Sequence, residues 1–495
     1  MSPTILFAVL VGYFAILALV AKFTSQRADD ASFFAGNKSS DWRVVAFGMV
    51  GTSLSGVTFV SVPGAVGVAG FTYFQIVLGN VIGYILVARI LLPIYYKLNL
   101  TSIYQYLEVR FGPRARLSGA GFFLLSRLLG AVARLYIVIN ILQVFVLDHL
   151  GVPFIVTSIA ILVMILLYTL KGGVKTIVWT DLLQTFCMLG GLAICSVMLL
   201  SMLDISFVES IVRIAADAPR IFETAPSAPD FLLKQIVAGA LITVTMSGLD
   251  QEMMQKSISV RTLADSQKNL YVLAGVFLFV ICAFLYFGAL MHMFAASAGI
   301  GAAGDGLFPT IVMQYMAPWI QIIFVIALVS ALFPSADGAL TALTSSVCID
   351  FLRLDQRGDM TAKAKTRTRH IVHFTFAGVF LALLVGFKFF DSANIIFVIL
   401  KMATFTYGPL LGMYAFGLFC SGRPVDRHVP LICLAGPTGC ALLDGFQTSI
   451  FASYRFGFEL LFVNGLIVFA GLYASGLWHA GRGQKSRRLR PLVKN

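Results

Sequence analysis

Charge is what this sequence has least of. Only 12% of the 495 residues are charged, whereas 59% are hydrophobic, and the mean hydropathy is +0.90. Soluble domains are about one quarter charged. A chain with so few polar side chains cannot cover its own surface in water, so the composition excludes a soluble globule. Repeated apolar runs of about 20 residues predict an all-α, polytopic membrane protein instead.

Side chains typical of catalytic and metal centres are also scarce. The chain has six histidines and seven cysteines, and no two cysteines form a CxxC pair. This argues against a zinc site and a disulfide framework and predicts buried, inert thiols. The cysteines are Cys187, Cys195, Cys282, Cys348, Cys420, Cys433 and Cys440. Since no catalytic triad or phosphate-binding loop appears either, we expect a protein that is not an enzyme.

The apolar runs predict thirteen membrane spans. They cover approximately residues 4–22, 43–71, 73–97, 116–146, 152–170, 175–203, 231–255, 267–296, 317–351, 370–390, 393–420, 428–444 and 458–478. In the first run the positive charges, Lys22 and Arg27, follow the apolar residues. We therefore expect a first span rather than a cleaved signal peptide.

The basic residues predict how these spans are oriented. Most Lys and Arg residues fall on alternate loops, among them the RGDMTAKAKTRTR loop and the tail GRGQKSRRLRPLVKN. Another loop of this set is predicted to carry Lys256, Arg261 and Lys268. Because cytoplasmic loops are enriched in Lys and Arg, we expect the N-terminus outside and the C-terminus in the cytoplasm of a cell membrane. The net charge of +13 is then a topology signal and does not indicate nucleic-acid binding.

One short segment between the third and fourth spans is not a span itself. Its sequence, TSIYQYLEVRFGPRAR, alternates Tyr, Leu and Phe with Glu and Arg. This pattern predicts an amphipathic helix that lies in the cytoplasmic interface of the membrane.

Two spans carry helix-breaking residues. The second span contains GTSLSGVTFVSVPG, and the seventh contains TVTMSGLDQEMMQK. A broken helix in a membrane is tolerated only where it faces protein or water. Because the two breaks lie five spans apart, they predict a five-plus-five inverted repeat in which each repeat contributes one unwound helix to a central site. The alternative for each stretch is close packing of helices through small residues.

Ionisable side chains inside membrane spans are costly and indicate function. Those inside the predicted spans include Arg127, Arg134, Asp181, Asp250, Glu252, Asp337 and Lys401. Asp181 and Asp337 predict a site for a coupling cation, because a hard cation takes oxygen ligands. The alternative is internal ion pairing, Asp337 with Lys401 or Asp181 with Arg134. Arg134 and Lys401 likewise predict capture of a substrate anion or, alternatively, pairing within the protein.

Several of these stretches resemble the sodium:solute symporter family. They are TSIYQYLEVRFG, GGVKTIVWTDLLQ, GLDQEMMQK and SADGALTALTSS, and the resemblance covers nearly the whole chain. It implies a leucine-transporter-type fold with an extra N-terminal helix. The expected divisions are 1–42 for that helix and its loop, 43–203 and 231–420 for the two repeats, and 421–495 for two further helices and the basic tail.

The resemblance also implies where sodium would bind. A site between the second and ninth spans falls on the backbone carbonyls of Gly51, Leu54 and Ala331 and on the hydroxyl of Ser335. Pro334 stands where the family has a second hydroxyl. Either the carbonyl of Ser330, which Pro334 leaves without its usual N–H donor, or Asp337, about one turn further on, is a candidate replacement. A second sodium site, present in some members, would use Asp181 with hydroxyls of the ninth span, whose positions here fall on Asp337 and Gly338.

The substrate site implied by the family lies between the second, third, seventh and eleventh spans, with the fourth nearby. Its candidates here are Ser53, Asn80, Arg134, Thr243, Met246 and Lys401. The two cationic residues favour a carboxylate-bearing solute such as a sugar acid. We therefore predict sodium-coupled symport of a small organic solute by alternating access, with a monomeric functional unit. Proton coupling remains an alternative because two neighbouring carboxylates raise the pKa of one of them, and a solute-binding membrane sensor is another.

Overall fold

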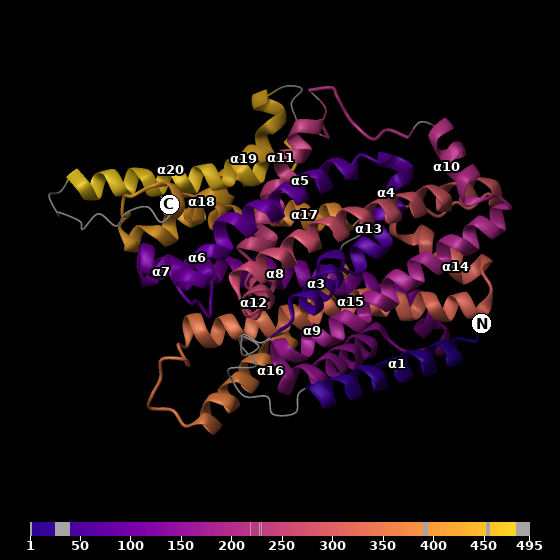
Figure 1. Cartoon of the computed structure of the whole chain (residues 1–495), viewed down its shortest axis with the longest axis horizontal. Coiled ribbons are helices and arrows are strands. Elements are labelled where there is room, and N and C mark those ends of the chain that lie inside the picture. The colour runs from indigo at the N-terminus through magenta and orange to yellow at the C-terminus, as the bar shows by residue number, and fades with distance from the viewer. Residues whose placement is uncertain are drawn as a thin grey trace.

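The computed structural model of the chain describes residues 2–24, 40–217, 219–226, 228, 230–389, 395–451 and 456–481, with the backbone alone for 171–175, 395–397, 448, 450–451 and 479–481. These residues form α-helices with short π- and 3₁₀-helical turns. An isolated β-bridge joins Ser40 to Val260. Figure 1 shows that most of the long helices run in roughly the same direction across the molecule.

Nine helices in the described ranges are long and apolar enough to cross a membrane, and two bent pairs raise the number to as many as eleven. The nine are formed by α1 (Pro3–Thr24), α5 (Tyr73–Leu86) with η2 (Val87–Leu91) and α6 (Leu92–Lys97), α8 (Pro113–Leu142), the second part of α9 (Phe154–Leu203), α13 (Leu263–Ala298), α15 (Pro318–Ser346), α16 (Ala362–Phe387), α19 (Val429–Phe451) and α20 (Leu460–Gly481). The all-α membrane fold is thus confirmed, whereas the count of thirteen spans stays a prediction. Phe154–Leu170 and α18 (Gly408–Phe419) are shorter apolar segments that also match predicted spans.

The second predicted span is broken at a single residue. α3 (Trp42–Leu54) and α4 (Gly56–Ala69) meet at Ser55, and the two helices are bent by 55°. Ser55 has a φ of 25°, outside the helical range; its N–H donates to the carbonyl of Gly51 in α3, and its carbonyl accepts from the N–H of Phe59 in α4. Pro63, by contrast, lies inside α4. The break therefore leaves carbonyls of the last turn of α3 without helical donors.

The seventh predicted span is broken as well. α11 (Leu232–Thr243) continues through the π-helical turn η5 (Val244–Gly248), and α12 (Gln251–Ile258) then leaves at an angle of 66°. Asp250 begins the second helix because its carboxylate accepts hydrogen bonds from the N–H groups of Glu252 and Met253. A capping carboxylate at the first turn offsets the unpaired N–H groups there.

α15 runs through the centre of the bundle between these two breaks. Every residue from Ala327 to Ser346 is buried, and α9, α8, α4 and α3 pack against the helix. The helix continues through Pro334, which has no N–H to offer to the carbonyl of Ser330. The Ser330 hydroxyl lies 2.6 Å from the hydroxyl of Tyr13 on α1, which ties the first span to this central helix.

The segment predicted to lie in the membrane interface is instead packed into the protein. It forms the short helix α7 (Gln105–Arg110), in which Tyr106, Leu107 and Arg110 are buried. Tyr106, seven residues before the start of α8, stacks on Tyr414 of α18. The alternation of aromatic and charged residues thus reflects burial against neighbouring helices, and the interfacial prediction was wrong.

An amphipathic surface helix does occur elsewhere, after α9. α10 (Phe207–Ala216) begins at Ser206, whose hydroxyl accepts from the N–H of Glu209, and it exposes Phe207, Val208 and Val212. The sequence analysis had assigned no element to these residues.

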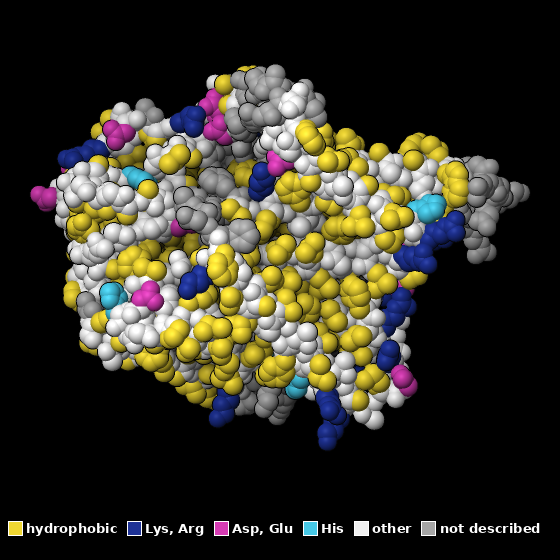
Figure 2. Space-filling view, turned by 180° about the vertical axis from the view of Figure 1, so that it is seen from behind, with side chains coloured by type: hydrophobic (Ala, Val, Ile, Leu, Met, Phe, Trp, Pro, Cys, Tyr) yellow, Lys and Arg dark blue, Asp and Glu magenta, His cyan; other side chains and the backbone are white. Residues whose placement is uncertain are grey.

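The outer surface carries the pattern expected of a chain surrounded by lipid. Figure 2 shows hydrophobic side chains over the middle of one face, with Lys and Arg side chains gathered at the right-hand edge of the view. Exposed apolar residues include Phe279, Phe186, Leu167 and Leu431. In a soluble monomer such extensive apolar exposure would mark an interaction surface, and here it matches the membrane spans.

Two glycines allow α5 and α11 to cross in backbone contact. A Cβ atom on Gly79 would lie 2.1 Å from the carbonyl oxygen of Ile236, and one on Gly239 would lie 2.1 Å from that of Ile76.

Since both obstacles are backbone atoms, we expect Gly239→Leu to lower the free energy of unfolding by about 3 kcal/mol or more, as severe overpacking does. Thermal unfolding of the purified protein in detergent measures this loss. Gly275→Leu on α13, where nothing lies within 4 Å, is the matched control; equal losses from the two variants would contradict the crossing.

Candidate functional site

A small polar cavity lies where the two broken spans meet. Its volume is about 110 Å³. It is lined by Thr52, Ser53, Ser55, Val57, Thr58, Tyr73, Asn80, Tyr84, Arg127, Arg134, Ile242, Thr243, Met246, Ser247, Met253, Phe277, Ile399 and Leu400. The lining combines both helix breaks with α5, α8, α13 and α17 (Ile395–Thr406). Five predicted substrate residues are brought together here: Ser53, Asn80, Arg134, Thr243 and Met246.

Lys401, the sixth predicted substrate residue, does not line the cavity. Its side chain is 58% exposed, and its Nζ lies 2.9 Å from Oδ2 of Asp444 on α19. The residues of α17 that face the cavity are Ile399 and Leu400. Successive helical residues differ in direction by about 100°, so Lys401 points away. The structure therefore supports neither the predicted contact of Lys401 with the cavity nor the alternative pair with Asp337.

Two arginines of α8 reach the cavity, and they differ in their partners. Arg127 is buried and forms an ion pair with Glu252 of α12. Arg134, two turns further along the same helix, has no carboxylate within ion-pair distance among the described residues. The alternative pair of Arg134 with Asp181 is therefore not formed. A half-buried guanidinium with five N–H donors is left facing the cavity.

The neutral side chains of the cavity hold one another across helices. The hydroxyl of Ser53 lies 3.2 Å from that of Tyr84 on α5. Asn80, in the amide orientation that its neighbours require, donates to the carbonyl of Gly239 at 2.9 Å and to the hydroxyl of Thr243 at 3.1 Å. These contacts join α3, α5 and α11 around the cavity.

Oxygen atoms that can hold a sodium ion lie beside the break at Ser55. A Cβ atom on Gly56 would lie 3.7 Å from the carbonyl oxygen of Ala331, so α15 approaches the break closely there. The hydroxyl of Ser335, one turn further along α15, is buried and has no hydrogen-bond partner in the described part of the chain. Sodium sites in broken-helix transporters use carbonyls freed by unwinding. The predicted ligands Gly51, Leu54, Ala331 and Ser335 thus belong to two elements that meet at the break. The Ser335 hydroxyl has no partner in the described residues, whereas the carbonyl of Gly51 accepts the N–H of Ser55, and the sodium-binding role of the set stays a prediction.

Asp337 faces a different side of α15. Its Oδ2 accepts a hydrogen bond of 2.8 Å from the hydroxyl of Tyr168 on α9, and its Oδ1 accepts one of 2.5 Å from the N–H of Gly338. Residues two apart on an α-helix differ in direction by about 200°. Asp337 and Ser335 therefore point to opposite sides, and this geometry does not favour Asp337 as the replacement for the missing hydroxyl.

Asp181 is held by a residue that the sequence analysis had placed in a loop. Lys256 of α12 is 2% exposed, and its Nζ lies 2.8 Å from Oδ2 of Asp181. The same nitrogen donates to the hydroxyl of Thr52 at 2.7 Å, and that hydroxyl donates to Asp181 at 3.1 Å. The prediction of a cytoplasmic Lys256 was wrong. Its position four residues after Glu252, on the same helical face, was the signal available in the sequence.

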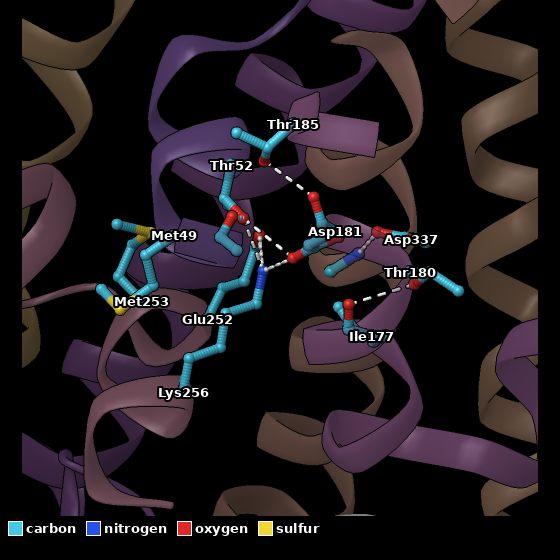
Figure 3. A network of polar contacts seen from close by, with 12 residues as sticks. Met49, Thr52, Ile177, Thr180, Asp181, Thr185, Glu252, Met253, Lys256 and Asp337 are labelled. Atoms are coloured by element: carbon cyan, nitrogen blue, oxygen red, sulfur yellow. Dashed lines mark hydrogen bonds and ion pairs between the residues drawn. The ribbon is translucent and has the colours of Figure 1, made fainter. Parts of the chain in front are cut away.

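These charges form one continuous chain of alternating sign. It runs from Arg127 at the cavity to Glu252, then to Lys256 at 3.6 Å, and then to Asp181. Figure 3 shows the ammonium group of Lys256 between Thr52, Glu252 and Asp181. Asp337 lies beyond Asp181, close enough for the two carboxylates to interact. Because Lys256 already fills the space beside Asp181, these residues do not fit a second sodium ion.

A helical membrane bundle with a polar cavity at two broken spans defines a secondary transporter of the broken-helix type. The model of the sodium:solute symporter family matches residues 33–423, and the chain belongs to that family. The predicted resemblance is therefore confirmed.

Three relatives illustrate the range of the family. The sodium/sialic acid symporter SiaT of Proteus mirabilis is 25% identical, over 83% of this chain and 84% of its own. Sodium-coupled monocarboxylate transporter 1 of Homo sapiens is 25% identical over 78% of this chain and 64% of its own. The human sodium/iodide cotransporter is 25% identical over 69% of this chain and 55% of its own. The matched part of the chain thus spans less than two thirds of each human relative.

Two solved structures share the fold. A substrate-bound, outward-open structure of a Na⁺-coupled sialic acid symporter matches with a TM-score of 0.82 and 20% identity, over 98% of this chain and 99% of its own. Mhp1, a nucleobase-cation-symport-1 family transporter in a closed conformation, matches with a TM-score of 0.59 and 14% identity, over 92% and 95%. The leucine-transporter-type fold is thereby confirmed.

Removing one partner from the buried chain of charges should destabilise the protein. Glu252→Gln leaves Arg127 without its carboxylate, and breaking a buried ion pair in this way costs about 3–5 kcal/mol. We expect a corresponding fall in thermal stability in detergent, and Arg127→Met combined with Glu252→Gln should recover part of it. The control is Lys401→Gln, whose exposed pair contributes about 1 kcal/mol or less. If Glu252→Gln lowers the thermal stability no more than Lys401→Gln does, the pair of Arg127 with Glu252 is not the stabilising contact that its burial indicates.

Proposed function

We propose that this protein is a sodium-coupled symporter of a small, carboxylate-bearing solute. The observation that carries the proposal is Arg134, a guanidinium that faces the cavity at the helix breaks and has no protein carboxylate as partner in the described residues. Arginine binds carboxylates through two parallel hydrogen bonds. A cation kept at the cavity without a partner is stabilised when an anionic solute enters.

The names of the relatives point in the same direction. Sialic acid, a monocarboxylate and iodide are all anions at neutral pH, and each appears in the name of a relative together with sodium. A sugar acid uses the other features of this cavity best, because the hydroxyls of Ser53 and Tyr84 and the amide of Asn80 offer partners to sugar hydroxyls. Iodide would leave these groups without a role.

The size of the cavity supports transport by alternating access. At about 110 Å³ it is smaller than the roughly 300–1,000 Å³ of typical small-molecule sites. A sugar acid therefore requires the helices around the cavity to move apart. The two breaks supply hinges for this motion, since the halves of each broken span can tilt independently at Ser55 and at Leu249–Asp250.

The coupling ion would join the first of these hinges to the central helix. Gly51 and Leu54 belong to α3 before the break, and Ala331 and Ser335 belong to α15. Ligands from both elements would be pulled together around one cation, which favours the arrangement in which Arg134 can receive solute. Loss of the cation would free the two elements to separate.

Two alternatives remain for the same fold. Proton coupling would use one of the neighbouring carboxylates Asp181 and Asp337 as the proton carrier. A sensor that binds solute without moving it would use the same cavity. We further propose a monomeric unit in a cell membrane with the C-terminus in the cytoplasm, and the division into two repeats at 43–203 and 231–420.

Replacing the guanidinium should abolish recognition of acids but spare the fold. We expect Arg134→Gln to weaken the binding of a carboxylate by about 100-fold, because truncating a desolvated charge pair costs about 2–5 kcal/mol. Thermal stabilisation by N-acetylneuraminate or lactate, with sodium present and with neutral glucose for comparison, measures the loss. Arg213→Gln, on exposed α10, is the matched control and should bind as the parent protein does. Unchanged carboxylate binding in Arg134→Gln would refute this role.

Removing the buried hydroxyl of Ser335 should weaken sodium specifically. We expect Ser335→Ala to raise the sodium concentration needed for half-maximal solute uptake in proteoliposomes by about tenfold, since one ligand and about 1.4 kcal/mol are lost. Ser196→Ala on α9, whose hydroxyl bonds only to its own helix at Leu192, serves as control. Uptake with the same sodium dependence in both variants, or uptake driven by a proton gradient alone, would argue for the alternative.

A further inference from the structure

We propose that Lys256 is a tethered cation: its ammonium group occupies the cation position beside Asp181, so that the transporter binds one sodium ion where two positions exist. The count of one rests on the proposed sodium coupling, whereas the occupation of the position by lysine does not.

The surroundings of the ammonium group are those of a small cation. Three oxygens surround Nζ, at 2.8 Å from Asp181, 2.7 Å from Thr52 and 3.6 Å from Glu252. They come from three elements, α9, α3 and α12. A lysine ammonium is a compact point charge with three N–H donors, and a hard cation takes oxygen ligands. The oxygens that a free cation would take as ligands from these elements therefore surround the ammonium group of Lys256 instead.

The two carboxylates that contact Lys256 are each already matched by a positive charge. Asp181 is matched by Lys256, and Glu252 is matched by Arg127. Of the two oxygens of Asp181, Oδ2 contacts Lys256 and Thr52, while Oδ1 has no hydrogen-bond partner in the described residues. A sodium ion near that oxygen would lie within a few ångströms of the ammonium charge, in a buried region where repulsion between like charges is strong. The neighbouring carboxylate of Asp337 already accepts hydrogen bonds from the hydroxyl of Tyr168 and from the N–H of Gly338. The one remaining oxygen of Asp181 does not form a cage against that repulsion.

The tether also joins the two broken spans. Lys256 lies on α12, the half of the seventh span after its break, and Thr52 lies on α3, the half of the second span before its break. A free ion that bridged these elements would leave with every cycle. The lysine cannot leave, so this bridge adds nothing to the number of ions moved.

The test is the number of sodium ions bound by the purified full-length protein, measured with ²²Na⁺ at equilibrium and without solute. We expect one ion per chain in the parent protein. Lys256→Ala removes the tethered charge and frees the oxygens of Asp181 and Thr52, so the number should rise by one. Lys256→Ala combined with Asp181→Asn should return it to the parent value, and Lys256→Arg, which keeps the charge, should match the parent.

Each possible number of bound sodium ions either supports or overturns the tethered cation. Two sodium ions bound by the parent protein would overturn the proposal, and this measurement holds even when the alanine variant does not fold. A folded Lys256→Ala protein that binds as many ions as its parent would overturn it as well. Binding of no ion by the parent and of one by Lys256→Ala would support the tethered cation while removing the proposed sodium coupling, so the two failures are distinguishable.

Discussion

Every polar group of the backbone must find a partner where lipid surrounds a protein, and this constraint determines where the site can be. A helix may be interrupted at membrane depth only if its freed groups face other protein atoms or a water-filled cavity. The breaks at Ser55 and at Leu249–Asp250 meet this condition because α15 lies between them, buried along its whole central part. Small residues of α15 and of the second span permit the approach, as the contact between Gly56 and Ala331 shows. The cavity, the oxygen cluster at Ser335 and the ionic chain all lie around these two interruptions.

The same environment explains how the charges are arranged. An unpaired charge is costly in a medium of low dielectric constant, so buried ions are paired or hydrogen-bonded. Along Arg127, Glu252, Lys256 and Asp181 each charge has an opposite neighbour. Arg134 departs from this rule within the described residues, and it does so at the cavity wall. A stable fold tolerates such an exception where a ligand or water supplies the missing partner, which is why an unpaired guanidinium is informative about function while the paired one is not.

The helices and both broken spans could be predicted from the sequence, because apolar runs of membrane length and clusters such as GTSLSG are local signals. Which ionisable side chains pair with one another could not be predicted from local signals. The sequence offered the pairs Asp181 with Arg134 and Asp337 with Lys401, because it shows only the spacing of residues along single helices. Which face of one helix meets which face of another depends on the rotation of each helix in the bundle, and that is set by packing. The buried position of Lys256 could not be predicted for a related reason. A lysine near the end of a predicted span is assigned to a loop unless the bend of 66° that carries its helix, α12, into the bundle is known. Five of six substrate candidates nevertheless line the cavity. Ser53, Thr243 and Met246 belong to the broken segments themselves, whereas Asn80 and Arg134 lie on α5 and α8.

The cavity and the buried chain of charges share side chains, so a movement of one displaces the other. Thr52 lines the cavity and also bonds to Lys256, and Arg127 lines it while pairing with Glu252. Ser53, the next residue after Thr52, contacts Tyr84 on the cavity side, and α15 approaches the break at Gly56. A change in the tilt of α3 therefore alters the cavity and the contact with α15 at once. In the proposed mechanism, coupling needs no pathway over a distance: the helical turn that ends at Ser55 would offer oxygens to the ion and hydroxyls to the solute, while Lys256 holds Thr52 of the same turn near Asp181.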